Sequence, residues 1–307
     1  THATGPNLGY NVTLINDIDV SEYDGDIRIG DVGDKLGDHG KFDGQGHTIK
    51  GLTHIASTTN DAGLFAYTSS GAVIKNLVIE GANIKSALRG GIIAGRAEGT
   101  KFENISVRNS TLEMYTQGAV INLITFGGMC GGTLVGEMED SYMYNCESVE
   151  STIKINTTAG VQALGGDGIY LGGLVGGVTG KNTNSVIEYS RVIGGMIDNS
   201  FDVAIAALNG KILYSGGIAG YLQNNAQLID CYATPHVLAS GEIYVAVGAG
   251  LDVRVGGIAA SVYGDGVKLE RCHFAGSLRS HLVNSILLLP IIVMEDYYLY
   301  GILGPSY

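Results

Sequence analysis

The sequence predicts an all-β fold in which one parallel β-helix takes up almost the whole chain. Three observations support this: a glycine-flanked apolar motif that recurs seven times, a six-residue pattern that follows each of the first six copies, and inserted segments with strand–turn–strand character. A repeat of about 40 residues is typical of solenoids and other stacked arrays, because each repeat buries its apolar face against its neighbours.

The first motif places two or three apolar residues between small ones. Its copies are GLFA at 63–66, GIIAG at 91–95, GTLVG at 132–136, GLVG at 173–176, GIAG at 217–220, GIAA at 257–260 and GILG at 301–304. The closing Gly or Ala positions are separated by 29, 41, 40, 44, 40 and 44 residues. Glycine allows tight corners and close approach of neighbouring backbones, so each copy is expected to mark a corner of one coil.

The second pattern has an apolar residue, a variable residue, a polar residue and then alternating apolar positions. Its copies are IKNLVI at 74–79, FENISV at 102–107, MYNCES at 143–148, IEYSRV at 187–192, LIDCYA at 228–233 and LERCHF at 269–274. Asn and Asp tolerate a left-handed backbone, so the third place predicts a tight bend between two short strands. The places concerned are Asn76, Asn104, Asn145, Tyr189, Asp230 and Arg271.

Stacking these coils in register puts one residue of each copy into a single inward column. The column consists of Leu77, Ile105, Cys146, Ser190, Cys231 and Cys272. This placement explains three of the four cysteines as small, buried, apolar side chains. A disulfide between Cys231 and Cys272 on adjacent coils is the open alternative. The spacing of the cysteines and histidines gives no zinc motif.

Longer segments are inserted after the second pattern, at 117–127, 160–171, 202–214 and 242–255. Several alternate apolar and polar residues around a glycine-containing centre, which is typical of a strand, a turn and a second strand. We therefore expect these extra strands to stack on one another, either widening the solenoid or adding a side sheet. A helix is disfavoured by the frequent glycine and β-branched residues.

Composition excludes several classes of protein. The 307 residues include 30 acidic and 18 basic side chains, for a net charge of -12, and 45% are apolar. The negative charge argues against a nucleic-acid partner, which needs a basic surface to neutralise phosphates. No apolar stretch is long enough for a membrane-spanning helix. The chain begins at Thr1 without Met or a leader, so we expect a mature or excised segment.

The glycine-flanked copies resemble the GLUG motif of large bacterial surface and secreted proteins. The N-terminal order of LINDIDV at 14–20, FDGQGHTI at 42–49, GLFAY at 63–67 and IKNL at 74–77 adds to the resemblance. It implies a right-handed, pectin-lyase-like β-helix for nearly the whole chain, with 1–50 as an N-terminal segment and acidic loop and 51–307 as the repeats. Ala66 and Ala260 depart from the closing glycine, and the long inserts depart from the short coil of the family.

A search for catalytic chemistry finds no stacked column of acids beside a basic residue, as polysaccharide lyases and hydrolases on this fold require. The segment from Asp43 to His47 has suitable residue types, but in similar folds it belongs to the first coil, where glycine makes turns. We therefore expect a protein that is not an enzyme and that carries no cofactor, with Ca²⁺ as the open possibility.

The acidic N-terminal loop is the candidate Ca²⁺ site. Nine of the chain's 30 carboxylates lie between Asp17 and Asp43, and Asp24 and Asp26 flank Gly25, which provides a bend. Carboxylate oxygens are the ligands that Ca²⁺ prefers. The spacing does not match an EF-hand loop, and a solvated acidic loop is the favoured interpretation.

The two ends of the chain are the candidate self-association sites. The chain stops three residues after the seventh motif, so we expect an unfinished last coil with unpaired backbone groups. No capping-helix pattern occurs at either end. A neighbouring copy could cover this face, and such a head-to-tail contact generates a fibre. The contact would join Tyr10, Val12, Leu14 and Ile15 to Tyr298, Tyr300, Ile302 and Leu303.

The sequence thus predicts a non-catalytic structural or adhesive protein, outside the cell or on its surface, in a bacterium. Its partner would be another copy of itself or a glycan or protein of a cell surface. The alternatives are a module that binds or degrades polysaccharide and a passive spacer in a larger surface protein. Acids that converge from the inserted segments would favour the enzyme.

Overall fold

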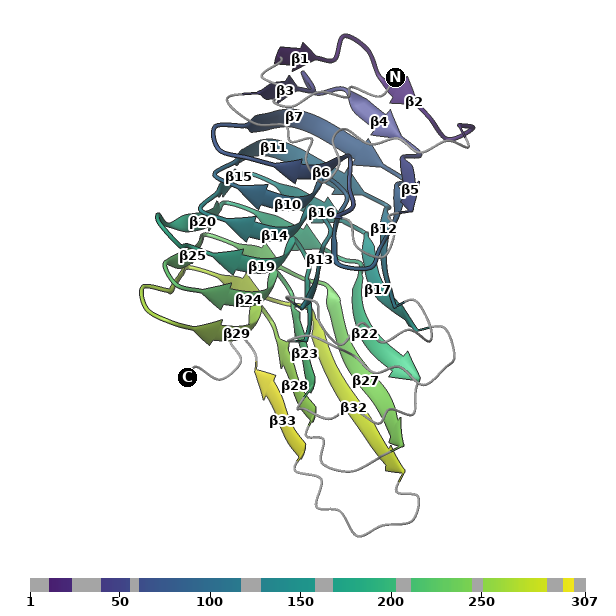
Figure 1. The fold of residues 1–307 in the computed structure, drawn as a ribbon, viewed down its shortest axis with the longest axis vertical. Coiled ribbons are helices and arrows are strands. Elements are labelled where there is room, and N and C mark those ends of the chain that lie inside the picture. Colours follow the sequence, from purple (N-terminus) through teal and green to yellow (C-terminus); the bar gives the residue numbers. More distant parts are fainter. Residues whose placement is uncertain are drawn as a thin grey trace.

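The chain folds into a right-handed parallel β-helix, as the sequence predicts (Figure 1). The computed structural model describes residues 11–23, 40–55, 61–116, 128–157, 168–202, 211–244, 251–285 and 295–300. Four sheets run along the stack, and the registered strand pairs are all parallel. No helix occurs among these residues. Each repeat passes through the sheets in a fixed order, so consecutive repeats lie directly above one another.

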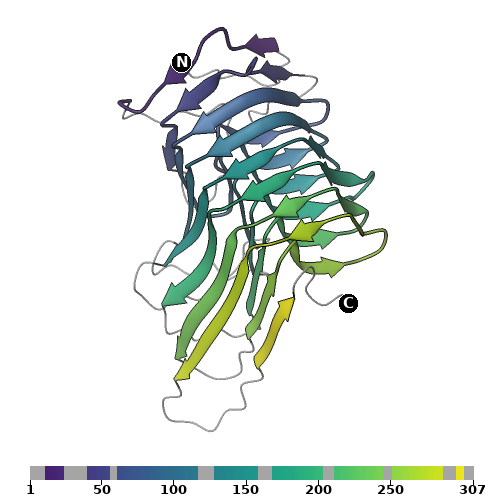
Figure 2. The same ribbon diagram turned by 180° about the vertical axis from the view of Figure 1, so that it is seen from behind.

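Sheet I is the 14-stranded bent sheet at the back of the view in Figure 1 and at the front in Figure 2. It contains β1 (Asn11–Thr13), β2 (Ile18–Asp19), β3 (Lys41–Asp43), β4 (Thr48–Lys50), β7 (Val73–Glu80), β11 (Lys101–Arg108), β15 (Tyr142–Tyr144), β16 (Glu147–Val149), β20 (Ser185–Glu188), β21 (Arg191–Ile193), β25 (Ala226–Ile229), β26 (Tyr232–Ala233), β30 (Lys268–Glu270) and β31 (His273–Phe274).

Each strand of sheet II begins within one of the first six copies of the glycine-flanked motif. It contains β6 (Phe65–Thr68), β10 (Ala94–Glu98), β14 (Val135–Glu139), β19 (Val175–Thr179), β24 (Ala219–Gln223) and β29 (Ala259–Tyr263). Its strands lead directly into sheet I, and the two sheets enclose the main core together with sheets III and IV.

Sheets III and IV hold the strands on either side of the inserted segments. Sheet III contains β5 (Thr53–Ile55), β8 (Asn83–Ser86), β12 (Thr111–Thr116), β17 (Thr152–Thr157), β22 (Met196–Asp202), β27 (His236–Tyr244) and β32 (Ser277–Ser285). Sheet IV contains β9 (Arg89–Gly91), β13 (Met129–Gly132), β18 (Ile169–Gly172), β23 (Lys211–Gly216), β28 (Leu251–Gly256) and β33 (Glu295–Tyr300). Their later strands extend away from the coils as two facing layers (Figure 1). Where the predicted inserts are described, at 168–171, 202, 211–214, 242–244 and 251–255, nearly all of their residues belong to these stacked strands. The remaining parts, 117–127, 160–167, 203–210 and 245–250, lie outside the described residues.

The predicted bend is present at every proposed position. The backbone is left-handed at Asn76, Asn104, Asn145, Tyr189, Asp230 and Arg271, with φ between 48° and 55°. At the N-terminal end the asparagine side chains form a ladder: Asn104 Nδ2 donates to Asn76 Oδ1 at 3.0 Å, and Asn145 Nδ2 donates to Asn104 Oδ1 at 2.8 Å. The ladder replaces water as the partner of these amides and fixes the direction of the turn.

The predicted inward column lies in the core. Leu77, Ile105, Cys146, Ser190 and Cys231 are buried, and Cys272 is partly exposed near the last described coil. In-register pairing aligns Ile105 with Leu77, so identical positions on successive coils pack against each other. The apolar cluster around this column runs from Leu14 in the first coil to Ala259 near the last. This continuous core holds the stack together, because no single coil can bury its own apolar face.

Candidate functional site

The N-terminal self-association residues lie at one end of sheet I. Val12 in β1 and Ile15 after it are exposed, by 39% and 78%, whereas Leu14 is only 8% exposed and packs into the core. β1 pairs with β3 and β2 pairs with β4, so these short strands form the outermost layer of the described sheet. Val12 and Ile15 are therefore available for a contact, and the Leu14 side chain stabilises the first coil.

Two of the four C-terminal partners, Tyr298 and Tyr300, lie at the opposite end of the described structure. Both residues belong to β33, the last strand of sheet IV, and β33 pairs with β28 of the preceding coil. Ile302 and Leu303, like Tyr10, lie outside the described residues. Among the described strands, β29, β32 and β33 end sheets II, III and IV, and β30 and β31 end sheet I, so the last described strands of all four sheets lie at this end of the stack (Figure 2).

The acidic loop is only partly described. Asp24 and Asp26 lie outside the described residues, so the Ca²⁺ site there stays a prediction. Asp17 is described, and the backbone N–H of Thr48 donates to its Oδ1 at 2.9 Å. This bond, followed by the contact with His47 Nδ1 at 3.1 Å, lowers the pKa of Asp17. Within the described ranges, no three His, Cys, Asp or Glu side chains are grouped to hold a metal ion.

Asp43 has a structural role in the first bend. Its Oδ1 accepts hydrogen bonds from Asn76 Nδ2 and from the backbone N–H of Gln45, both at 3.0 Å. The Asn76 bond is the main cause of the lowered pKa of Asp43, and Lys75 Nζ lies 3.2 Å from its Oδ2. These partners occupy the carboxylate and extend the asparagine ladder by one coil.

All four cysteines are free thiols, so the structure contains no Cys231–Cys272 disulfide. Cys231 and Cys272 lie on adjacent coils and interact through their side chains. The hydrogen bond between them raises the pKa of Cys231 and lowers that of Cys272 to about 7. Burial raises the pKa of Cys146 to about 12, so this thiol stays protonated and acts as core packing.

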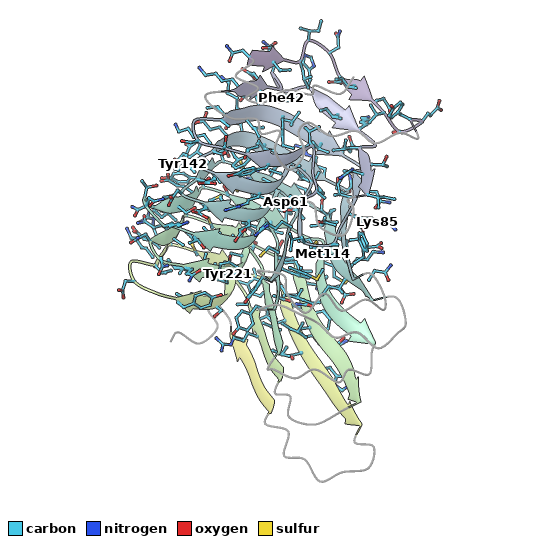
Figure 3. The ribbon with its side chains drawn as sticks, viewed as in Figure 1. Phe42, Asp61, Lys85, Met114, Tyr142 and Tyr221 are labelled. Carbon is cyan, nitrogen blue, oxygen red and sulfur yellow. The ribbon has the colours of Figure 1, made fainter. Side chains whose placement is uncertain are left out.

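A group of largely buried charges lies where sheets II and IV meet, and the sequence did not predict it. Arg89 Nη1 lies 3.4 Å from Asp61 Oδ1, and Arg89 Nε donates to Glu137. The hydroxyl of Tyr221 donates to Glu137 at 3.2 Å, and Arg96 Nη2 lies 3.4 Å from Glu139. Figure 3 shows Asp61 at the centre of the molecule. The three acids are separated from their arginine partners by 28 to 48 residues, so only the coil register could have indicated the group.

The electrostatics of this group favour a structural role. Burial raises the pKa of Asp61, against the opposing effect of Arg89. Burial also disfavours the charged form of Arg89, but the carboxylates of Glu137 and Asp61 outweigh it and raise the Arg89 pKa. A general acid or base must exchange a proton with a substrate, whereas these carboxylates are held by guanidinium groups. The group therefore joins the two sheets electrostatically.

Tyrosines fill the angle between sheets II and IV below these charges. Tyr170 contacts Tyr214 and Tyr221 edge-on, with ring centroids 5.5 Å and 4.8 Å away, and Tyr221 stacks on Tyr263 at 5.8 Å. The guanidinium of Arg254 lies 4.6 Å from the Tyr214 ring centroid. Cys130 belongs to the same small cluster. These rings are packing elements, as is typical of tyrosines stacked along a solenoid.

Comparison with known proteins supports the fold and gives no family. No protein family model matches the chain, so the GLUG resemblance has no support from that source. Halomucin from Haloquadratum walsbyi is 29% identical over 119 residues, which is 39% of this chain and 1% of halomucin. Among the described residues, no helix is long and apolar enough to cross a membrane.

Two solved structures are similar over nearly the whole chain. A structure described as IgA1 protease matches with a TM-score of 0.53 and 18% identity, covering 98% of this chain and 20% of that one. A candidate immunoglobulin A1 protease from Bacteroides ovatus matches with a TM-score of 0.43 and 17% identity, covering 99% of this chain and 79% of that one. The chain thus spans a small part of halomucin and of the IgA1 protease, and its β-helical fold resembles a region of the latter.

Proposed function

We propose that this chain is a non-catalytic structural and adhesive module of a larger protein, located outside the cell or at its surface. The observation that carries the proposal is the unbroken in-register stacking of coils from the first to the last described strands. Such a stack is stiff, because neighbouring coils are hydrogen-bonded to each other, along four sheets in most of the described stack. Stiffness along one axis suits a protein that holds other modules away from a surface.

The comparisons support a module inside a long chain. The matched region makes up 20% of the IgA1 protease structure and 1% of halomucin, so segments similar to this chain occur within much larger proteins. The resemblance to surface and secreted proteins favours an extracellular location. The acidic and basic side chains between sheets II and IV form ion pairs with one another, which favours a structural role over catalysis.

We further propose that the module assembles head to tail. One end exposes Val12 and Ile15, and the other presents the edges of β29, β32 and β33. Unpaired strand edges are templates for pairing with another chain. A contact between two different ends is heterologous and does not close, so repeated contacts produce a filament.

Electron microscopy of the purified chain over a concentration series, with and without Ca²⁺, tests this assembly. We expect filaments one solenoid wide with an axial repeat of about seven coils of ~4.8 Å each. The double substitution Val12→Lys and Ile15→Lys should abolish them, because it places charges on the contact. The matched control Met196→Lys changes a residue of similar exposure on the lateral face and should leave filaments intact. Monodisperse rods at every concentration would reject assembly and favour a spacer.

A further inference from the structure

Three exposed tyrosines lie on consecutive coils along the outer face of sheet I. Tyr144, Tyr189 and Tyr232 expose 39%, 51% and 38% of their surface. Tyr144 pairs with Glu188, the residue before Tyr189, and Tyr232 pairs with Arg191, two residues after Tyr189. The three rings therefore lie before, in and after the bend on three adjacent coils. We call these three residues and the side chains between them the tyrosine strip.

Neighbouring side chains hold the rings in place. Tyr144 stacks on Tyr142 with centroids 6.3 Å apart and contacts Tyr189 edge-on at 5.6 Å. Tyr142 donates from its hydroxyl to Glu188 Oε2 at 2.7 Å. Tyr232 lies parallel to His273, with an interplanar angle of 2°. Binding of a ligand here costs little conformational entropy of the protein, because the aromatic surface is already formed.

Charges on this face cancel, although the whole chain carries -12. Between β11 and β31 the strands of sheet I and their bends carry five acidic and five basic residues. All five basic residues form ion pairs. Arg191 Nη2 and Arg108 Nη2 lie 2.7 Å and 3.1 Å from the carboxylate of Glu147, and Lys101 Nζ lies 3.6 Å from that of Glu103. Arg271 contacts Asp230, and Lys268 contacts Glu270. A charged polymer would have to break these pairs, whereas a neutral polyol would not.

We propose that the tyrosine strip binds a neutral polysaccharide, with sugar rings stacked on the three tyrosines and the glycan chain running along the solenoid axis. Phenol rings combine an apolar face with a polar edge, which suits the C–H faces and hydroxyl groups of a pyranose. The carboxylates of Glu188 and Asp230 accept hydrogen bonds from sugar hydroxyls beside the rings. The coil rise of ~4.8 Å is close to the length of one sugar residue, so each coil presents one subsite.

The same bend continues toward the N-terminal end as an open hollow with mixed polar and apolar lining. An open depression of about 440 Å³ is lined by Gln45, Gly46, Asn76, Leu77, Val78 and Asn104. Asn76 and Asn104 occupy the same bend position as Tyr189, three and two coils earlier. Carboxamides donate and accept hydrogen bonds, so a long glycan that leaves the tyrosines can continue along this hollow.

Affinity electrophoresis in native gels tests the inference with defined probes. Soluble neutral polysaccharides (hydroxyethylcellulose, xyloglucan, galactomannan and dextran) and the polyanion polygalacturonate are cast into the gel. We expect at least one neutral polymer to retard the wild-type chain and polygalacturonate not to retard it. Each of Tyr144→Ala, Tyr189→Ala and Tyr232→Ala should raise the apparent Kd by about threefold to tenfold, because one aromatic contact is lost.

Two further variants separate binding from folding. Tyr189→Phe keeps the ring and should bind nearly as well as the wild type, whereas Tyr23→Ala removes a 56% exposed tyrosine away from the strip and should change nothing. Absence of retardation by all neutral polymers, retardation by polygalacturonate alone, or full binding by the three alanine variants would overturn the inference. A dimer seen by sedimentation and lost in Tyr189→Ala, without glycan binding, would assign the strip to a second copy and also overturn it.

The inference builds on the proposed adhesive role and names its partner, but it uses a lateral face that is separate from the two ends. Filaments that form without glycan binding reject the glycan site alone. Glycan binding by rods that never form filaments rejects the end-to-end assembly alone.

Discussion

Single glycines at the corner between sheets IV and II determine how closely these sheets approach. A Cβ at Gly136 would lie 2.5 Å from the carbonyl oxygen of Gly95 and 2.8 Å from the backbone nitrogen of Gly90. A Cβ at Gly132 would collide with the carbonyl oxygen of Val135. Both obstacles are backbone atoms held in sheets, so they cannot move aside at low cost. The glycine-flanked motif is therefore a packing requirement of the corner.

Gly136→Ala should lower the free energy of unfolding by about 1–3 kcal/mol, the usual cost of overpacking. Gly81→Asn is the control: its position has φ +67° with open space around a Cβ, and Asn109 occupies the equivalent position in the next coil. The control should change stability by less than about 0.5 kcal/mol. Urea denaturation followed by circular dichroism measures both, and equal stability of the two variants would contradict the packing account.

The thiols should differ in reactivity. Cys272 is partly exposed and its pKa is lowered to about 7 by the hydrogen bond from Cys231, whereas the other three cysteines are buried. Because the thiolate is the reactive form, an aromatic disulfide reagent should titrate one thiol in the native protein and four after unfolding. Cys272→Ser should remove the native-state reaction. Simultaneous reaction of all four thiols would show that the coils open readily.

At the scale of the strands, ion pairs across coils strengthen the outer face of sheet I. Glu147 in β16 accepts from Ser106 Oγ at 2.7 Å and contacts Arg108 in β11 and Arg191 in β21. One carboxylate therefore bridges three successive coils. Burial by itself would raise the Glu147 pKa, but the bonds from Ser106, Arg191 and Arg108 outweigh it, and the pKa is lowered.

Stability should therefore fall in acid partly through Glu147. Its folded pKa lies below the ordinary glutamate value of ~4.3, so its contribution is complete above that pH and is lost as the pH falls through the lowered pKa. Glu147→Gln should be less stable than the wild type near neutral pH, and the difference in Tm should shrink toward about pH 3. Thermal melts from pH 3 to pH 7 measure this. Parallel pH profiles for the two proteins would mean that Glu147 has no shifted pKa.

At the scale of the whole molecule, stability depends on contacts between nearest-neighbour coils. A central coil is covered on both sides, whereas β1, β2 and the strands that end each sheet are covered on one side only among the described residues. Solenoids of this kind lose structure from their ends inward. The facing layers of sheets III and IV add a lateral extension to the stack without interrupting it (Figure 1).

Hydrogen exchange followed by mass spectrometry should reveal this gradient. Amides in β14, β19 and β24 should be the slowest to exchange, because these strands pair on both sides in the middle of sheet II. Amides in β1 and β2 should exchange fastest, because these strands have two or three residues and one partner each. The control is the same measurement on assembled filaments, if they form, where β1 should become protected. Uniform exchange along the chain would contradict stability from neighbouring coils.

Several features of the fold could be predicted from the sequence because they are local and periodic. The bend at Asn76, Asn104 and Asn145 was predictable because asparagine adopts the left-handed backbone conformation more readily than most residues. Tyr189 and Arg271 follow the same bend although neither residue favours it, because the register of neighbouring coils imposes the conformation. The inward column was likewise visible from the alternation of apolar residues.

The candidate sites could be predicted only in part. Val12 and Ile15 are exposed, as the end-to-end contact requires, whereas Leu14 is buried. The sequence could not separate them, because burial of one residue in an apolar run depends on which side chains pack against it in the folded protein. The charged group of Asp61, Arg89 and Glu137 and the tyrosine strip were not predicted, because their members come from different coils and carry no shared motif.

By itself the sequence determined the repeat, the parallel β-helix and the positions of its bends, because these follow from periodicity and from the tolerance of single residues for a left-handed backbone. Only the tertiary structure decided which side chains meet across coils. Coil spacing and register are set by backbone hydrogen bonds between segments about 40 residues apart, and an error of one residue would turn every outer side chain inward. The outer tyrosines and the buried ion pairs therefore became visible only when the coils were stacked.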